Sequence, residues 1–235
     1  MRGLSPIDLL TTVSDCDVID VPTAPRRSRG FLFIRFTMAM ARHARTTYPG
    51  AHYHITSRGN NKKTIFDNDN DRLLFLKLLG TAVLKFGWKC YAYCLMDNHF
   101  HLYIETPDDN VSVGMKHLNG QFASAMNKRY GRIGHVFQSR FHSIIIKDDQ
   151  QRLNVARYVV LNPVRAGLVQ NPKQWKWSSY NATAGFAKEP IWLLGKDIIR
   201  YFENNTKSAQ QEYSQFILQG INGLSPLENA IKGML

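Results

Sequence analysis

An apolar run with two histidines at its centre, residues 95–105, is the feature that most constrains this chain. It reads Leu-Met-Asp-Asn-His-Phe-His-Leu-Tyr-Ile-Glu, and its bulky apolar flanks predict a buried β-strand. Successive strand side chains point to opposite faces, so His99 and His101 share one face and Phe100 lies on the other. Two imidazoles on one rigid face supply half of a divalent-metal site. The alternative is a strand with two satisfied histidines, because two ligands do not make a metal site.

The residues around this strand predict an α+β fold. From residue 51 the pattern gives the order β, α, β, β, α, β, α. The predicted strands are 51–58, 88–96, the two-histidine strand and 135–146, and the predicted helices are 73–86, a helix from Ser112 to Gly131, and one from Asp148 that ends at Asn162-Pro163. The βαββαβ portion matches a ferredoxin-like sandwich with a central antiparallel sheet, to which the last helix is added. In that arrangement the first and third strands are the central pair, so the two-histidine strand is held rigidly.

The net charge of +12 and the pI of about 9.7 indicate a polyanionic partner, nucleic acid first and a membrane surface second. Residues 41–185 carry 20 Lys and Arg against nine Asp and Glu, whereas residues 186–235 carry five of each. The excess therefore lies with the two-histidine strand, which favours a folded polyanion-binding surface. Six polar side chains are expected to contact nucleic-acid phosphates, three at and after the end of the first predicted strand and three that alternate along one face of the fourth. They are Arg58, Lys62, Lys63, Gln138, Arg140 and His142.

The cysteine content and hydropathy give expectations about the compartment. The three cysteines are odd in number and lack zinc-finger spacing, which indicates a reduced, intracellular compartment. Cys90 and Cys94 fall in an apolar strand and are interpreted as small core residues. No apolar run is long enough to span a bilayer, so no membrane partner is expected. We expect a cytoplasmic, nucleoid-associated protein.

Three regions are predicted along the chain. Residues 1–40 mix small polar residues, prolines and a basic cluster, and are interpreted as a weakly ordered extension. Residues 41–185 contain the regular pattern and form the predicted catalytic domain. Residues 186–235 are interpreted as a helical extension that packs on the core or on a partner chain, since 198–202 and 208–218 have helical spacing of apolar residues.

A second pair of histidines, His52 and His54, lies in the first predicted strand. Its flanks are more polar, and Arg58, Lys62 and Lys63 follow closely. We interpret this pair as exposed or phosphate-facing rather than as metal ligands.

The predicted last helix supplies a candidate third metal ligand and a candidate nucleophile. Tyr158 and Asn162 are four residues apart and share one helix face. The Asn162 carbonyl oxygen suits a hard or borderline divalent ion, and Tyr158 would lie within reach of the same ion. A phenol of pKa about 10 is a weak nucleophile at neutral pH, but a metal that polarises a phosphate makes its target more electrophilic. The alternative is a tyrosine packed on the sheet and an asparagine that ends the helix.

Together these stretches resemble the HUH single-tyrosine transposases, specifically the REP-associated tyrosine transposases. The resemblance runs from about residue 41 to residue 185, in four ordered blocks with a closing segment. These are residues 48–60, 96–101, 137–141 and 158–169, followed by Trp-Lys-Trp-Ser-Ser-Tyr at 175–180.

The resemblance implies roles for four residues. His99 and His101 match the metal-binding pair and would hold Mg²⁺ or Mn²⁺, Tyr158 matches the nucleophile, and Asn162 stands where relatives carry a glutamine as third ligand. It also implies cleavage of single-stranded DNA beside a hairpin of REP-like inverted repeats. A 5′-phosphotyrosine link and a free 3′-OH would result, and the ends could be rejoined without ATP.

Three other functions stay open at this point. One is a non-catalytic protein that binds the same hairpins, the second is an HUH relaxase or replication initiator, and the third is an RNA-binding ferredoxin-like module. Both a monomer and a homodimer are compatible with the sequence.

Overall fold

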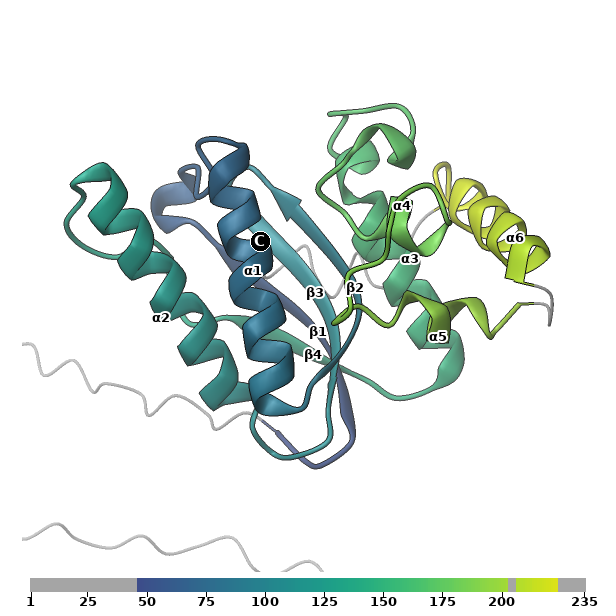
Figure 1. Ribbon diagram of the computed structural model, residues 1–235, viewed down its shortest axis with the longest axis horizontal. Coiled ribbons are helices and arrows are strands. Elements are labelled where there is room, and N and C mark those ends of the chain that lie inside the picture. The colour runs from purple at the N-terminus through teal and green to yellow at the C-terminus, as the bar shows by residue number, and fades with distance from the viewer. Residues whose placement is uncertain (1–45, 203–205, 224–235) are drawn as a thin grey trace, which may run out of the picture. The chain divides into compact units, whose positions relative to one another are not determined.

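Four segments of the chain pair into one antiparallel sheet of order β2-β3-β1-β4 (Figure 1). The computed structural model describes residues 46–202 and 206–223. Its elements are β1 (Ala51–Arg58), η1 (Asn60–Lys62), α1 (Asp69–Phe86), β2 (Lys89–Met96), β3 (His99–Thr106), α2 (Val111–Tyr130), β4 (His142–Ile146), α3 (Asp149–Arg165), η2 (Pro172–Gln174), α4 (Tyr180–Thr183), α5 (Gly195–Ile199) and α6 (Thr206–Gln219). The predicted α+β class is confirmed, with β1 and β3 as the central pair. The predicted extension 1–40 lies outside the described residues.

The face of the sheet that packs against α1 and α2 is built on aromatic side chains. Phe75 of α1 contacts Phe100 of β3 and Phe122 of α2, with ring centroids 4.6 and 5.2 Å apart. All three side chains are fully buried. Phe100 is the residue between the two histidines, so its burial here directs His99 and His101 to the other face, as the alternation predicts.

The opposite face is covered by α3, with the C-terminal helices outside it (Figure 1). Helix α3 contributes Val155, Val159 and Val160 to this second core. Tyr213 of α6 is buried and stacks on Tyr180 of α4, with ring centroids 6.1 Å apart. The expected packing of the C-terminal helices on the core is therefore observed. No helix within residues 46–202 or 206–223 is long and apolar enough to cross a membrane.

The outer edge of β2 is covered by the segment that follows α3. The backbone N–H of Leu95 donates to the carbonyl oxygen of Trp177 (2.9 Å), and the N–H of Ser179 donates to that of Tyr93 (3.0 Å). The indole N–H of Trp175 donates to the carbonyl oxygen of Leu95 (3.1 Å). These bonds satisfy an edge that would otherwise be open to pairing with another chain. Cys90 and Cys94 of β2 are free and fully buried, as predicted for small core residues.

The fourth strand is shorter than predicted. It spans His142–Ile146 instead of 135–146, and Gln138 and Arg140 lie in an irregular, exposed loop. The loop is attached to the end of β1 by two backbone bonds: Asn60 donates to Val136 (2.8 Å) and Gln138 donates to Arg58 (3.0 Å). Because pairing stops at these two contacts, Gln138 and Arg140 do not alternate with His142 on one strand face.

Helix α3 does not stop at Asn162-Pro163 but continues to Arg165. Proline has no N–H, so the carbonyl oxygen of Val159 lacks its usual i+4 donor. The side-chain amide of Asn162 donates to the carbonyl oxygens of Tyr158 (2.8 Å) and Val159 (3.4 Å) instead. This substitute donor lets the helix run through the proline. Helix α2 also begins before its predicted cap Ser112, at Val111.

A buried carboxylate joins α1 to the end of α2. Asp71 is fully buried and forms an ion pair with Arg129 of α2. It also accepts hydrogen bonds from the Tyr130 hydroxyl (2.7 Å) and from the backbone N–H of Asp67 (2.9 Å). The next residue, Arg72, forms an ion pair with Asp97 in the turn that precedes β3. This junction therefore fixes the place where the two-histidine strand begins.

We expect Asp71→Ala to lower the free energy of unfolding by at least about 2 kcal/mol, because several charge-assisted hydrogen bonds are lost inside the protein. Urea denaturation of the full chain measures the change. Asp69→Ala is the matched control on the same helical turn. The Asp69 side chain is 55% exposed, so its ion pair with Lys176 should contribute less than about 1 kcal/mol. Equal effects of the two substitutions would contradict the role given to Asp71.

Candidate active site

The register of β1 against its two neighbours gathers the polar residues on the α3 face of the sheet. Thr56 of β1 is paired with His101 on one side and with His142 on the other. Arg58, two residues on, is paired with His99. Directly paired residues of antiparallel strands project to the same face. One cross-strand row on this face therefore contains Arg58 and His99. The next row contains His142, Thr56 and His101.

His101 is fully buried and half satisfied. Its Nδ1 lies 3.0 Å from Nε2 of His54 on β1, and the two rings stack with a 10° angle between their planes. Its Nε2 is buried and has no hydrogen-bond partner among the residues that the structure describes. Buried polar atoms in folded proteins normally have partners, so an unpaired imidazole nitrogen on the α3 face is a feature that requires a reason.

His99 is held by the turn before it. Its Nδ1 lies 2.7 Å from Oδ1 of Asn98, whose amide nitrogen donates to the carbonyl oxygen of Lys62 (3.0 Å). The N–H of Gly59 donates to the carbonyl oxygen of Asn98 (2.8 Å). Gly59 itself is required, because a Cβ at this position would lie 2.1 Å from the carbonyl oxygen of Lys63. With Nδ1 bonded to an amide oxygen, the Nε2 lone pair of His99 is the one left for a ligand.

Burial keeps these imidazoles neutral at pH 7. It lowers the pKa of His99 to about 4, helped by the charge of Arg58, and lowers the pKa of His54 to about 3. The pKa of His101 lies well below its ordinary value because of burial and the neighbouring histidines His99 and His54. Neutral imidazole is the form that binds a metal, so no proton has to be displaced from these rings.

Tyr158 of α3 lies over the same histidines. Its ring meets His54 and His101 edge-on, with centroid distances of 5.5 and 5.8 Å. The guanidinium of Arg165, two turns further along α3, lies 5.2 Å from the centre of the Tyr158 ring. All of these residues belong to one chain, so α3 brings the phenol to the two-histidine strand without a second subunit.

The donor set fits a hard or borderline divalent ion. Within the described ranges no group of three His, Cys, Asp or Glu side chains is placed to hold a metal. The buried Nε2 of His101 and the corresponding nitrogen of His99 lie on the same face of β3, and Asn162 lies one turn beyond Tyr158 on α3, so an imidazole pair and an amide oxygen are the candidate ligands. The Asn162 amide nitrogen is bonded to its own helix, which leaves Oδ1 as the atom that would serve. Imidazole and amide oxygen are both ligands that Mn²⁺ accepts.

The predicted DNA contacts are only partly gathered at this site. Arg58 and His142 lie on the histidine face, as described above. Lys62 and Lys63 are exposed at η1, which the Asn98–Lys62 hydrogen bond joins to the start of β3. Gln138 and Arg140 are exposed in the loop before β4.

His52 and His54 are neither exposed nor phosphate-facing, contrary to the expectation. Both are buried. His54 bonds His101, whereas Nδ1 of His52 lies 3.1 Å from the Tyr103 hydroxyl and its Nε2 lies 3.5 Å from Glu105. Both residues lie on β1 beside β3, and side chains of β3 and helix α3 cover them. The predicted central pairing of strands one and three was the signal that could have placed His54 beside His101.

The sheet order, the two histidines on a central strand and the tyrosine helix across them agree with the DNA-processing fold that the resemblance to HUH transposases implied. Residues 47–162, from the turn before β1 to Asn162, match the family model described as "Transposase IS200 like". The match covers just under half of the chain and shows that this part is similar to that family.

One curated relative and one solved structure with the description of REP-associated tyrosine transposase are similar to this chain, the latter in fold. A protein of Haemophilus influenzae (strain ATCC 51907 / DSM 11121 / KW20 / Rd) with the name "Putative REP-associated tyrosine transposase" is 29% identical over 107 residues. The match covers 41% of this chain and 61% of that protein, so the chain spans about three fifths of its relative. The solved structure of a REP-associated tyrosine transposase bound to a REP hairpin superposes with a TM-score of 0.55 at 18% identity, over 65% of this chain and 90% of that one.

Proposed function

We propose that this protein is a metal-dependent DNA strand transferase that cuts and rejoins single-stranded or hairpin DNA through a 5′-phosphotyrosine intermediate. The observation that carries the proposal is the edge-on contact of Tyr158 with His101, whose Nε2 is buried and unpaired. A nucleophile beside candidate metal ligands suits metal-assisted phosphoryl transfer through a covalent intermediate. The match of residues 47–162 to the IS200-like transposase family supports the same reaction.

His99, His101 and the Oδ1 atom of Asn162 would hold Mg²⁺ or Mn²⁺. A metal bound there supplies Lewis-acid polarisation of the scissile phosphate. The protein residues contribute orientation. Asn98 fixes the ring of His99 through a 2.7 Å contact, and the Asn162 amide is fixed by its bonds to α3.

Tyr158 is the nucleophile in this proposal. Its hydroxyl oxygen forms a bond to phosphorus while the bond from phosphorus to the 3′ oxygen breaks. The phenolic proton is lost to solvent, and the leaving 3′ oxygen takes up a proton from solvent. The products are a 5′-phosphotyrosine and a free 3′-OH. Because one phosphoester replaces another, the bond energy is conserved and a later 3′-OH can reverse the step. One tyrosine in this position holds one cut end at a time.

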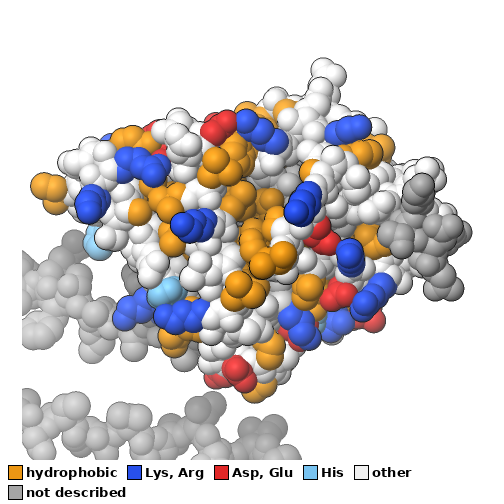
Figure 2. Space-filling model, viewed as in Figure 1, with side chains coloured by type: hydrophobic (Ala, Val, Ile, Leu, Met, Phe, Trp, Pro, Cys, Tyr) orange, Lys and Arg blue, Asp and Glu red, His pale blue; other side chains and the backbone are white. Residues whose placement is uncertain are grey.

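The DNA surface would lie at the end of the sheet where β3 begins. A cavity of about 540 Å³ lies beside η1 and the loop before β4, and its lining includes Lys63, Arg132 and His135. Figure 2 shows Lys and Arg side chains spread widely over one face of the molecule. The positive charge of the lysines around η1 and of Arg140 in the loop before β4 suits phosphate contacts. The hairpin in the solved relative supports a REP-like hairpin as the partner.

One chain would form a complete site. Tyr158, His99, His101 and Asn162 are all supplied by β3 and α3 of the same molecule. We therefore propose that catalysis does not require exchange of the tyrosine helix between subunits, whether the protein is a monomer or a homodimer.

Tyr158→Phe should abolish the covalent DNA adduct while leaving hairpin binding within a few-fold of wild type, because only the nucleophilic oxygen is removed. A denaturing gel with a labelled single-stranded oligonucleotide that carries a hairpin, with and without Mg²⁺, measures the adduct. Tyr180→Phe, a buried tyrosine on the same side of the sheet, is the control and should retain it. An adduct that survives in Tyr158→Phe places the nucleophile elsewhere. A wild-type chain that binds hairpins but never forms an adduct is a non-catalytic binder.

His99→Ala and His101→Ala should each remove cleavage and the rise in melting temperature that Mn²⁺ gives to the wild-type chain, since each deletes a ligand. Thermal denaturation with and without Mn²⁺ reports binding independently of activity. His117→Ala, which removes a histidine of α2 on the other face, should behave as wild type. Normal cleavage by both site variants would end the metal assignment.

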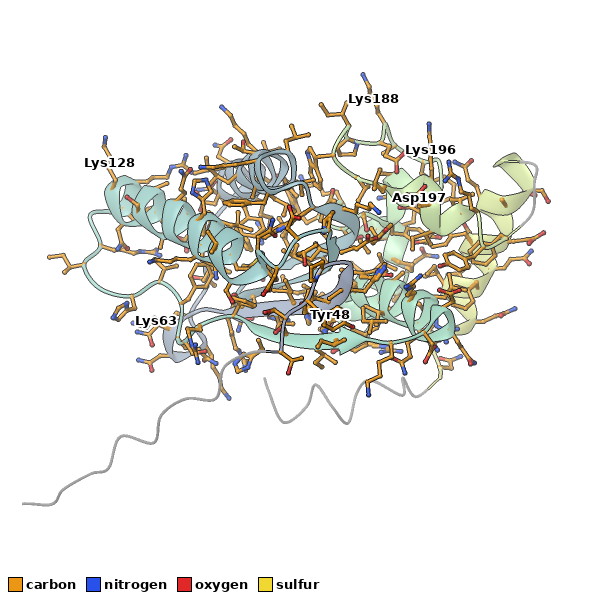
Figure 3. All side chains as sticks on the ribbon, turned by 90° about the horizontal axis from the view of Figure 1, so that it is seen from below. Tyr48, Lys63, Lys128, Lys188, Lys196 and Asp197 are labelled. Carbon is orange, nitrogen blue, oxygen red and sulfur yellow. The ribbon has the colours of Figure 1, made fainter. Side chains whose placement is uncertain are left out.

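Arg140→Ala should weaken hairpin binding and reduce the slope of log K against log salt by about one, because one phosphate contact is lost. Lys188→Ala is the control, since Lys188 is exposed and Figure 3 shows it far from Lys63. Fluorescence anisotropy at several salt concentrations gives both quantities. An unchanged affinity and slope would make Arg140 a residue without a DNA contact.

A further inference from the structure

The two histidines of β1 have the same spacing as those of β3 but different partners. His52 and His54 both lie on the α3 face, as their shared strand parity requires. His52 contacts Tyr103 and Glu105 at the far end of β3. His54 contacts His101, a proposed metal ligand, through a 3.0 Å separation between two ring nitrogens. The first motif therefore divides into one residue outside the site and one that touches it.

We propose that His54 is a positioning residue that accepts a hydrogen bond from Nδ1–H of His101 and thereby keeps Nε2 of His101 unprotonated for the metal. This proposal rests on the metal site of the proposed function. It assigns to a neutral imidazole the task that a carboxylate or a backbone carbonyl performs beside many metal-binding histidines.

The unpaired nitrogen of His101 decides between the two directions of this hydrogen bond. If His54 donated instead, His101 would carry its proton on Nε2. That N–H would be buried without an acceptor, which folded proteins rarely contain. With His54 as the acceptor, Nε2 of His101 holds a lone pair on the face where Tyr158 lies, and a metal would satisfy it.

The surroundings of His54 suit an acceptor of fixed orientation. Its side chain is buried, and its ring stacks on His101 while the Tyr158 ring meets it edge-on. His54 touches both the ligand and the nucleophile-bearing ring, so it also fixes their relative position.

Isothermal titration of the full-length chain with Mn²⁺ tests the proposal. His54→Phe keeps a flat ring but has no acceptor, and we expect its Mn²⁺ affinity to fall about 10- to 100-fold, the effect typical of lost partners behind a ligand. His54→Gln offers an amide oxygen near the position of Nε2, and should restore the affinity to within a few-fold of wild type. His52→Gln is the matched control from the same motif and should bind as wild type. Circular dichroism and melting temperatures show whether each variant is folded.

Nitrogen-15 NMR of the metal-free wild-type chain provides a readout that needs no variant. We expect the signals of His101 to report protonation at Nδ1 and a lone pair at Nε2. A proton on Nε2 would overturn the proposal, as would Mn²⁺ binding by folded His54→Phe that equals wild type.

These measurements distinguish failure of the proposed metal site from failure of the role given to His54. Wild-type Mn²⁺ binding no better than that of His99→Ala overturns the metal of the proposed function and the role of His54 with it. Normal wild-type binding with unchanged binding by His54→Phe overturns the role of His54 alone.

Discussion

The antiparallel pairing of β1 with β3 is the interaction on which the rest of this structure depends. Its register places Thr56 opposite His101 and Arg58 opposite His99, across eight residue pairs. Side chains alternate with a period of two, so a slip of one residue would send the β1 side chains to the opposite face. The aromatic core under α1 and α2 opposes such a slip, because Tyr53 and Ile55 of β1 are buried there. The core on one face thus sets the chemistry on the other.

Burial sets the protonation state of the histidines in the candidate site. Three imidazoles packed under α3 lose hydration, and their pKa values fall far enough to keep them neutral. Neutral rings do not repel one another, so His54 and His101 can stack at 5.2 Å. Tyr158 is also largely buried, whereas His99 is partly exposed beside the η1 turn. The side of the site next to His99 is therefore the open one, and the exposed lysines of η1 lie at this side.

The sequence predicted what depends on local pattern, and failed where distant contacts decide. The alternation around Phe100 was sufficient to direct the two histidines of β3. The first two helices also end where predicted, each followed by a glycine in the left-handed conformation, Gly87 and Gly131. The hydrogen bond between His54 and His101 joins residues 47 positions apart. The polar residues flanking the β1 histidines gave no sign of this contact, so the prediction that His54 is exposed was wrong. The loop before β4 looked like a strand by alternation, but only two of its backbone groups find partners at the end of β1.

The Asn162-Pro163 pair links an irregularity of α3 to the proposed third metal ligand. Proline removes a backbone donor, and the amide nitrogen of Asn162 replaces it at the carbonyl oxygens of Tyr158 and Val159. That bond uses the nitrogen end of the amide and fixes its plane, which leaves Oδ1 as the free end. A helix without the proline would not need the amide, and the side chain would keep more rotamers. In the proposed site, Asn162 would thereby be preorganised as an oxygen donor one helical turn from Tyr158.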